Sequence, residues 1–149
     1  LRIGPELKKF QFHKGLLAHH SLYFKNLSSG RWPSDDKRTI DLPGDNVEAW
    51  QCLFSWVYTR TLGQPHRETS DTDERKEIPV RNLVSNQCLM TFVLGDMRMM
   101  PGLKNAVIDE LFSLWTQGVI IPGPTHIGYI YDNTPAGSAV RKLLIDVLA

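Results

Sequence analysis

At the start of the chain, apolar residues stand at every second position. Leu1 and Ile3 stand before a Gly-Pro break, and Phe10 and Phe12 alternate with polar residues after it. Alternation places side chains on one face of a strand. Residues 1–12 therefore predict two short strands that pair as a hairpin.

A helical period begins at His13 and continues through two short helices. Leu16 and His20 share one helical face, because they are four positions apart. Ser21 is of the residue type that caps helix N-termini, which predicts that a second helix starts there and runs to Leu27.

The clearest helix follows a loop over residues 28–38 and a short strand over residues 39–42. Asp45 or Asn46 can cap this helix. Its apolar residues recur at steps of three and four: Val47, Trp50, Leu53, Phe54, Val57 and Tyr58. Because the stripe is large and aromatic, we expect this helix to be central to the core.

Residues 63–79 interrupt the apolar pattern. They are polar and charged and contain almost no apolar side chain. Burial in such a segment cannot offset the entropy lost on ordering it. We therefore expect a mobile surface loop, inserted within one domain.

After Pro79 the helical period returns as two antiparallel helices joined by a turn over residues 97–101. Gly118 is expected to end the second of them. Residues 122–131 predict an extended segment, first because of their prolines and then because their apolar side chains alternate. Ser138 is expected to cap a last helix.

The composition is that of one ordinary globular domain. The chain has 149 residues, of which 42% are hydrophobic and 22% charged, and its net charge is +1. A nearly neutral chain has no dense basic face, so we expect neither nucleic acid nor a membrane as a partner. The start resembles no signal peptide and no apolar run is of membrane-spanning length, so we expect an intracellular protein. Cys52 and Cys88 lie in apolar stripes, where reduced buried thiols are expected.

Patterns for catalysis, metals and cofactors are absent from the sequence. There is no glycine-rich phosphate loop, no Cys-x-x-Cys pair and no Gly-x-Ser-x-Gly elbow. His19 and His20 are adjacent, and adjacent helical side chains point about 100° apart, so both rarely reach one ion. We therefore expect no enzyme, no cofactor and no metal site. An enzyme with an unrecognised site is kept as the alternative of another class.

Three segments, in this order, resemble the BTB/POZ domain family: FQFHKGLLAHHSLYFKNL, IDLPGDNVEAWQCLFSWVYTRTL and LMTFVLGDMRMMPGLKNAVIDEL. The first has a His-Lys pair after a strand and then Ser-x-x-Phe, and the second has a helix that ends in Tyr-Thr-x-x-Leu. The matching positions are Phe10, His13, Lys14, Leu17, Ser21, Phe24, Tyr58, Thr59, Leu62, Met100, Leu103, Asn105 and Ile108. The resemblance implies an α+β BTB/POZ fold, with a small three-stranded sheet capped by five or more helices and an extra C-terminal helix.

The resemblance covers residues 1–117, including the polar insertion. It leaves residues 118–149 as a C-terminal extension that is expected to pack on or near the domain. Within this extension, YIYDNTPAGSAVRKLLIDVLA resembles the segment that follows the domain in BTB proteins of filamentous fungi. That resemblance implies a fungal source.

The resemblance also implies a non-catalytic domain that binds itself or another protein. One expected surface is the N-terminal strand with the first helix, which family members often use for homodimers. The other is the loop that follows the second helix, whose Arg-Trp pair has the composition of a binding hot spot. The candidate interface residues are Leu1, Ile3, Leu16, His20, Tyr23, Arg31 and Trp32.

A narrower alternative within the family is a substrate adaptor of a cullin-type ubiquitin ligase. In such adaptors a hydrophobic-x-Glu motif follows the second helix. The matching residues here are Trp32, Pro33 and Ser34, so serine replaces the glutamate. This departure argues against cullin binding.

Overall fold

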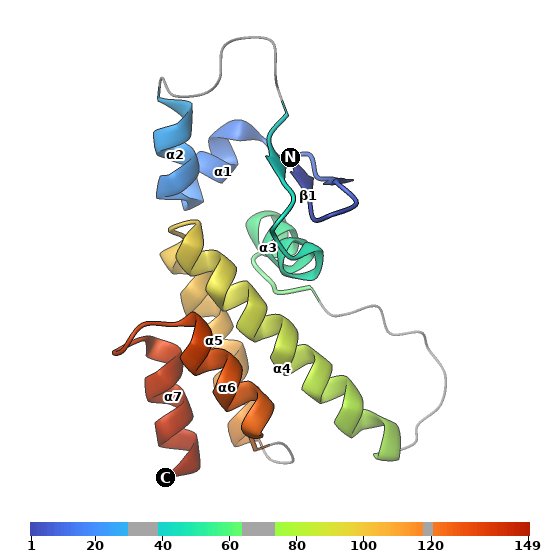
Figure 1. Ribbon diagram of the computed structural model, residues 1–149, viewed down its shortest axis with the longest axis vertical. Coiled ribbons are helices and arrows are strands. Elements are labelled where there is room, and N and C mark those ends of the chain that lie inside the picture. The colour runs from blue at the N-terminus through green and yellow to red at the C-terminus, as the bar shows by residue number, and fades with distance from the viewer. Residues whose placement is uncertain (30–38, 64–73, 118–120) are drawn as a thin grey trace.

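The computed structural model describes residues 1–29, 39–63, 74–117 and 121–149. These residues form three short strands and seven helices (Figure 1). In chain order the elements are β1 (Arg2–Ile3), β2 (Lys8–Lys9), α1 (Lys14–His20), α2 (Leu22–Ser28), β3 (Asp41–Leu42), α3 (Val47–Thr59), α4 (Glu74–Met97), α5 (Pro101–Thr116), α6 (Pro124–Asn133) and α7 (Ala139–Leu148). The side chains of α4 are described from Val84 onward. The α+β class, the three-stranded sheet and the cluster of more than five helices are as predicted.

The sheet has the strand order β2-β1-β3, with β1 antiparallel to β2 and parallel to β3. The hairpin turns at Gly4, whose φ of 76° suits glycine. The second strand was predicted around Phe10 and Phe12 but lies earlier, at Lys8–Lys9. The reason is that the short turn already brings Lys8 opposite Ile3. Phe10 still exchanges two backbone hydrogen bonds with Leu1, of 2.8 and 2.9 Å, and its side chain enters the core.

Two residues predicted to cap helix N-termini make the expected capping hydrogen bonds. Ser21 Oγ accepts a bond from the Phe24 backbone N–H at 3.2 Å, and this starts α2. Of the two candidates for the cap of α3, Asn46 is the one used: its Oδ1 accepts from the Ala49 N–H at 2.9 Å. Asp45 is therefore free for other partners, which are described below.

Helix α4 begins earlier than the sequence predicts. Residues 74–79 were expected in a loop, but they are helical in the structure. The segment is poor in apolar residues, yet its Glu, Arg and Lys residues are good helix formers and need no burial when they extend a helix that packs further along. The rest of the predicted loop, residues 64–73, lies outside the described residues.

Helix α6 corrects the prediction of an extended segment over residues 122–131. Pro124 stands at the first helical position, where proline is well tolerated, and the Gly123 N–H donates to His126 Nδ1 at 3.2 Å. His126 and Ile130 are four residues apart and both are buried, so the helical spacing prevails over the alternation of their neighbours. Helix α5 ends at Thr116, and the predicted terminator Gly118 lies outside the described residues.

Two hydrophobic clusters share the α4–α5 pair. The N-terminal cluster joins the sheet and α1–α3 to one end of this pair, and its members include Ile3, Phe10, Leu17, Phe24, Trp50, Leu53, Leu94, Met100 and Leu103. The C-terminal cluster joins the other end to α6 and α7, and its members include Leu89, Phe92, Val107, Leu111, Trp115, Ile130, Val140 and Leu144. Figure 1 shows α6 and α7 beside α4 and α5, remote from the sheet.

Candidate interaction surface

A buried ion pair fixes the end of α4 against the start of α3. Arg98 Nη2 donates to both carboxylate oxygens of Asp45, at 2.6 and 2.7 Å, and both side chains are about nine-tenths buried. Asp45 Oδ2 also accepts from Trp50 Nε1 at 2.8 Å. On the other side, the Arg98 guanidinium lies 4.9 Å from the centre of the Tyr23 ring. Charged groups this deeply buried need such partners, so the arrangement holds the α4–α5 turn in one place.

The same turn is bonded to the start of α2. Ser21 Oγ donates to the Arg98 carbonyl at 2.5 Å, and the Leu22 N–H donates to the Met99 carbonyl at 3.2 Å. The Leu22 N–H is one of the backbone groups that the N-terminus of a helix leaves without an intrahelical partner, and the N-cap hydroxyl of Ser21 adds a second bond to the turn. The turn and α2 therefore form one continuous surface.

The turn ends α4 in a Schellman motif. The Met100 N–H bonds to the Gly95 carbonyl at 2.8 Å, and the Met99 N–H bonds to the Asp96 carbonyl at 3.2 Å. In this motif the residue at the position of Met99 is left-handed and is usually glycine. Met99 has a φ of 53°, so a residue with a Cβ occupies a backbone conformation that disfavours it.

Three large apolar side chains are exposed on this surface. Leu22 is 47% exposed, Met97 56% and Met99 48%. We call these three residues the Leu22–Met99 patch. Methionine is flexible and polarizable, and exposed methionines are characteristic of surfaces that bind proteins.

The interface residues predicted from the sequence do not all lie on one exposed surface. Ile3 is 0% exposed and lies within the N-terminal cluster, so it supports the surface from beneath. Leu1, Leu16 and Tyr23 are half-buried and pack against that cluster, with Tyr23 bordering the turn through its contact with Arg98. Arg31 and Trp32 lie outside the described residues, as does the cullin-motif position around them.

His20 is half-buried against α3. Its ring meets Trp56 edge-on at 5.0 Å, and the Trp56 indole in turn lies 5.1 Å from the Arg60 guanidinium. Among the described residues, His20 Nε2 has no hydrogen-bond partner. Burial, followed by the positive charges of Arg60 and of His19, lowers the pKa of His20 from its usual 6.5.

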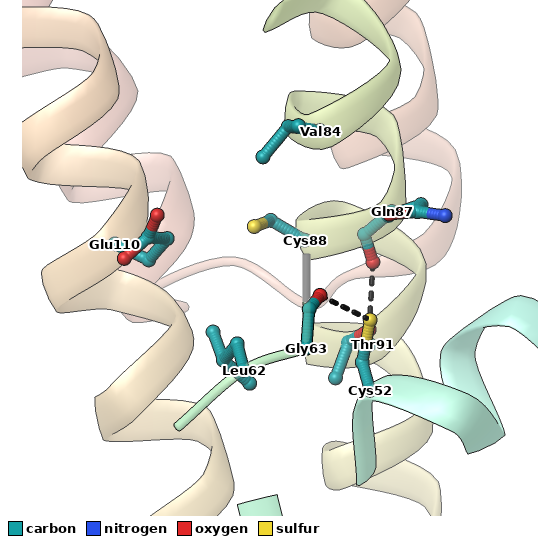
Figure 2. Close-up of a pocket in the computed structure, with 8 residues that line it drawn as sticks. All are labelled: Cys52, Leu62, Gly63, Val84, Gln87, Cys88, Thr91 and Glu110. Atoms are coloured by element: carbon teal, nitrogen blue, oxygen red, sulfur yellow. Dashed lines mark hydrogen bonds between the residues drawn. The ribbon is translucent and has the colours of Figure 1, made fainter. Parts of the chain in front are cut away.

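The two cysteines line a small pocket between α3, α4 and α5 (Figure 2). Cys52 and Cys88 share it with Leu62, Gly63, Val84, Gln87, Thr91 and Glu110, and its volume is about 10 Å³. Burial raises the pKa of the Cys88 thiol to about 12, so the nucleophilic thiolate is scarce at neutral pH. The two sulfurs are free thiols, as expected. In the part of the chain that the structure describes, no three His, Cys, Asp or Glu side chains gather in a way that could hold a metal ion.

Sequence reasoning missed the Leu22–Met99 patch. It assigned the methionines to a turn, and it did not distinguish Leu22 from the other apolar residues of α2. The sequence shows only that the α4–α5 turn contains no glycine for the left-handed position that ends a Schellman motif. Only the backbone of the turn identifies which residue is left-handed, and so the sequence alone could not single out Met99.

None of the described helices is both long enough and apolar enough to cross a membrane. Comparison with known families matches residues 3–75 to the BTB/POZ domain. The matched region contains the sheet and α1–α3, and the fold around it is the α+β arrangement of three strands and capping helices described above. BTB/POZ domains are generally protein-interaction and oligomerisation modules. This chain therefore contains a BTB/POZ domain at residues 3–75.

Proposed function

We propose that this chain is a non-catalytic protein-interaction domain that binds its partner through the Leu22–Met99 patch. The observation that carries the proposal is the exposure of three apolar side chains at the α4–α5 turn and the start of α2, where the buried Arg98–Asp45 ion pair fixes the turn from within. A rigid apolar surface loses little entropy when it binds. Tyr23 borders the patch and adds an aromatic contact of the kind enriched in hot spots.

The conformation of Met99 supports the same proposal. A left-handed residue with a Cβ costs roughly 1 kcal/mol compared with glycine. The Met99 side chain is half-exposed and so contributes little to the core in return. A methionine at such a strained position is explained by contacts that its side chain makes outside the chain.

A second contact is proposed at the N-terminal surface, formed by Leu1, Leu16, His20 and Tyr23. This surface would join two copies of the chain in a homodimer. Leu1 and Leu16 remain partly exposed on one side of the N-terminal cluster, and this leaves apolar area for a partner. Arg31 and Trp32, the candidates for the other predicted surface, lie outside the described residues and stay a prediction.

We also propose that the domain extends to residue 117 and that residues 118–149 form an extension packed against it. The α6 and α7 residues of the C-terminal cluster contact α4 and α5, which supports the packing of the extension against the domain. Cullin binding and a fungal source both remain predictions of the family resemblance, and no contact among the described residues favours either one.

The test compares a patch variant with a matched surface variant. Leu22→Asp combined with Met97→Asp places charge on the patch. Ile145→Asp places charge on α7, at a residue that is 58% exposed. Both designs alter exposed positions, so both proteins should fold. Light scattering measures self-association, and cross-linking in cells followed by quantitative mass spectrometry measures partner capture.

We expect the patch variant to lose a partner that the wild type captures, while Ile145→Asp retains it; both variants should keep any self-association, because the homodimer is proposed at the N-terminal surface. If the two variants behave alike, the patch is not the binding surface. A clean monomer at micromolar concentration would remove the homodimer proposal and leave the hetero-partner form.

A further inference from the structure

We propose that the free edge of β2 is a second binding site, which accepts an extended acidic segment of a partner protein as an added strand. This site lies on the sheet and is separate from the Leu22–Met99 patch. Its basis is a backbone edge whose hydrogen-bonding groups have no partner strand among the described residues, on a hairpin that carries positive charge.

The hydrogen-bond register shows which groups point outward. Leu1 and Phe10 exchange both of their backbone bonds, so they form a hydrogen-bonded pair of the antiparallel ladder. The next pair, Arg2 with Lys9, is then of the other kind, in which backbone groups point away from the partner strand. The Arg2 N–H confirms this, because it donates to Ile40 on the β3 side at 2.8 Å. The N–H and C=O of Lys9 therefore face the open side of β2.

The edge is held in shape before any partner arrives. Gly4 and Leu7 both have positive φ, and the Leu7 N–H closes the turn on the Gly4 carbonyl at 3.0 Å. Beyond β2, the Phe10 ring is anchored 6.4 Å from Trp50 and 6.1 Å from Phe54. Figure 1 shows this hairpin at the periphery of the molecule. A preorganised edge binds an added strand with less loss of entropy.

The charge of this region selects the partner. Residues 1–29 contain five Lys or Arg (Arg2, Lys8, Lys9, Lys14 and Lys25) and one acidic residue, Glu6. Arg2 is paired with Asp41, whereas Lys9 is exposed and forms no ion pair among the described residues. Lysines on an edge strand repel a second copy of the same edge, which prevents edge-to-edge aggregation. A strand that carries carboxylates meets attraction at the same place, so the edge discriminates in favour of an acidic partner.

The probe for the test is a synthetic peptide of alternating glutamate and valine with blocked ends. It is titrated into the full chain labelled with ¹⁵N, at low and at high salt. We expect the largest amide shifts at Lys9 and at Gln11, the next exposed residue along the edge. Lys8→Glu combined with Lys9→Glu should raise the Kd roughly tenfold, which corresponds to about 1.4 kcal/mol. The matched control Lys142→Glu, at an exposed position of α7, should leave the Kd unchanged.

A second peptide separates strand addition from simple charge attraction. It has the same sequence, but alternate amides on its pairing edge are N-methylated, so its charge is kept and its hydrogen bonds to β2 are lost. Loss of binding by this peptide supports the added strand. Equal binding of the two peptides, or equal weakening by Lys142→Glu, would overturn the proposal, as would the absence of shifts at Lys9. A milder variant, Lys9→Gln, serves if the double variant fails to fold.

Discussion

Arg98 and Asp45 are 53 positions apart in sequence, yet the guanidinium Nη2 lies 2.6 Å from Asp45 Oδ2 in the interior of the protein. The pair ties the end of α4 to the connection between β3 and α3. It also determines where the Leu22–Met99 patch is displayed, because the patch residues Met97 and Met99 flank Arg98.

Removing one partner of this pair is expected to be strongly destabilising. Arg98→Met leaves the Asp45 carboxylate buried without its cation, and we expect a loss of about 3–5 kcal/mol in the free energy of unfolding. Adding Asp45→Asn to Arg98→Met should recover part of this loss, because no uncompensated charge then remains buried. Urea denaturation of the two single variants and the double variant measures the coupling. Additive losses would show that the ion pair does not act as a unit.

Met99→Gly is expected to stabilise the protein. Glycine adopts the left-handed conformation without strain, so the free energy of unfolding should rise by about 0.5–1 kcal/mol. Met99→Ala is the matched control, since it removes the side chain but keeps the Cβ and should give no such gain. Thermal unfolding of both variants checks this, and equal stability of the two would contradict the strain argument. If the patch binds a partner, both substitutions should weaken that binding while only one stabilises the fold.

Much of the fold of the N-terminal half could be predicted, because helix caps and apolar stripes are recognised from a few neighbouring residues. Ser21 and Asn46 have the residue types of N-caps, and the aromatic stripe of α3 fixes its buried face. The errors occurred where local signals compete. Over 127–131 alternation suggested a strand, but the burial of His126 and Ile130 decides for a helix. The patch could not be predicted, because it depends on the backbone conformation of Met99 and on the distant Arg98–Asp45 contact.

The stability of the protein is expected to fall as the pH drops through about 6.5. The pKa of His20 is lowered in the folded state, so below its usual value of 6.5 the unfolded chain binds more protons than the folded one. Stability contributed by neutral His20 is therefore complete above that pH and declines below it. His20→Gln should flatten this part of the curve. Urea unfolding at pH 5.5 and 7.5 measures the difference, and parallel curves for variant and wild type would assign the pH dependence to other groups.

The Cys88 thiol is expected to resist modification in the folded protein. With a pKa of about 12, roughly one thiol in ten thousand is ionised at pH 8, and the side chain is buried. Cys52 is also buried, and burial raises its pKa too. A chromogenic disulfide reagent should therefore label both thiols quickly only after denaturation. Rapid labelling of the native protein would show that the pocket opens readily.

Leu94 belongs to the N-terminal cluster, whereas Phe92, one half-turn away on α4, belongs to the C-terminal cluster. Leu62 packs against both clusters. Unfolding of either cluster will therefore disturb the other, because both clusters pack on the same stretch of α4. We expect a single cooperative unfolding transition, in which α6 and α7 do not melt separately. Shortening the chain after residue 117 would consequently lower the melting temperature of the BTB/POZ region itself.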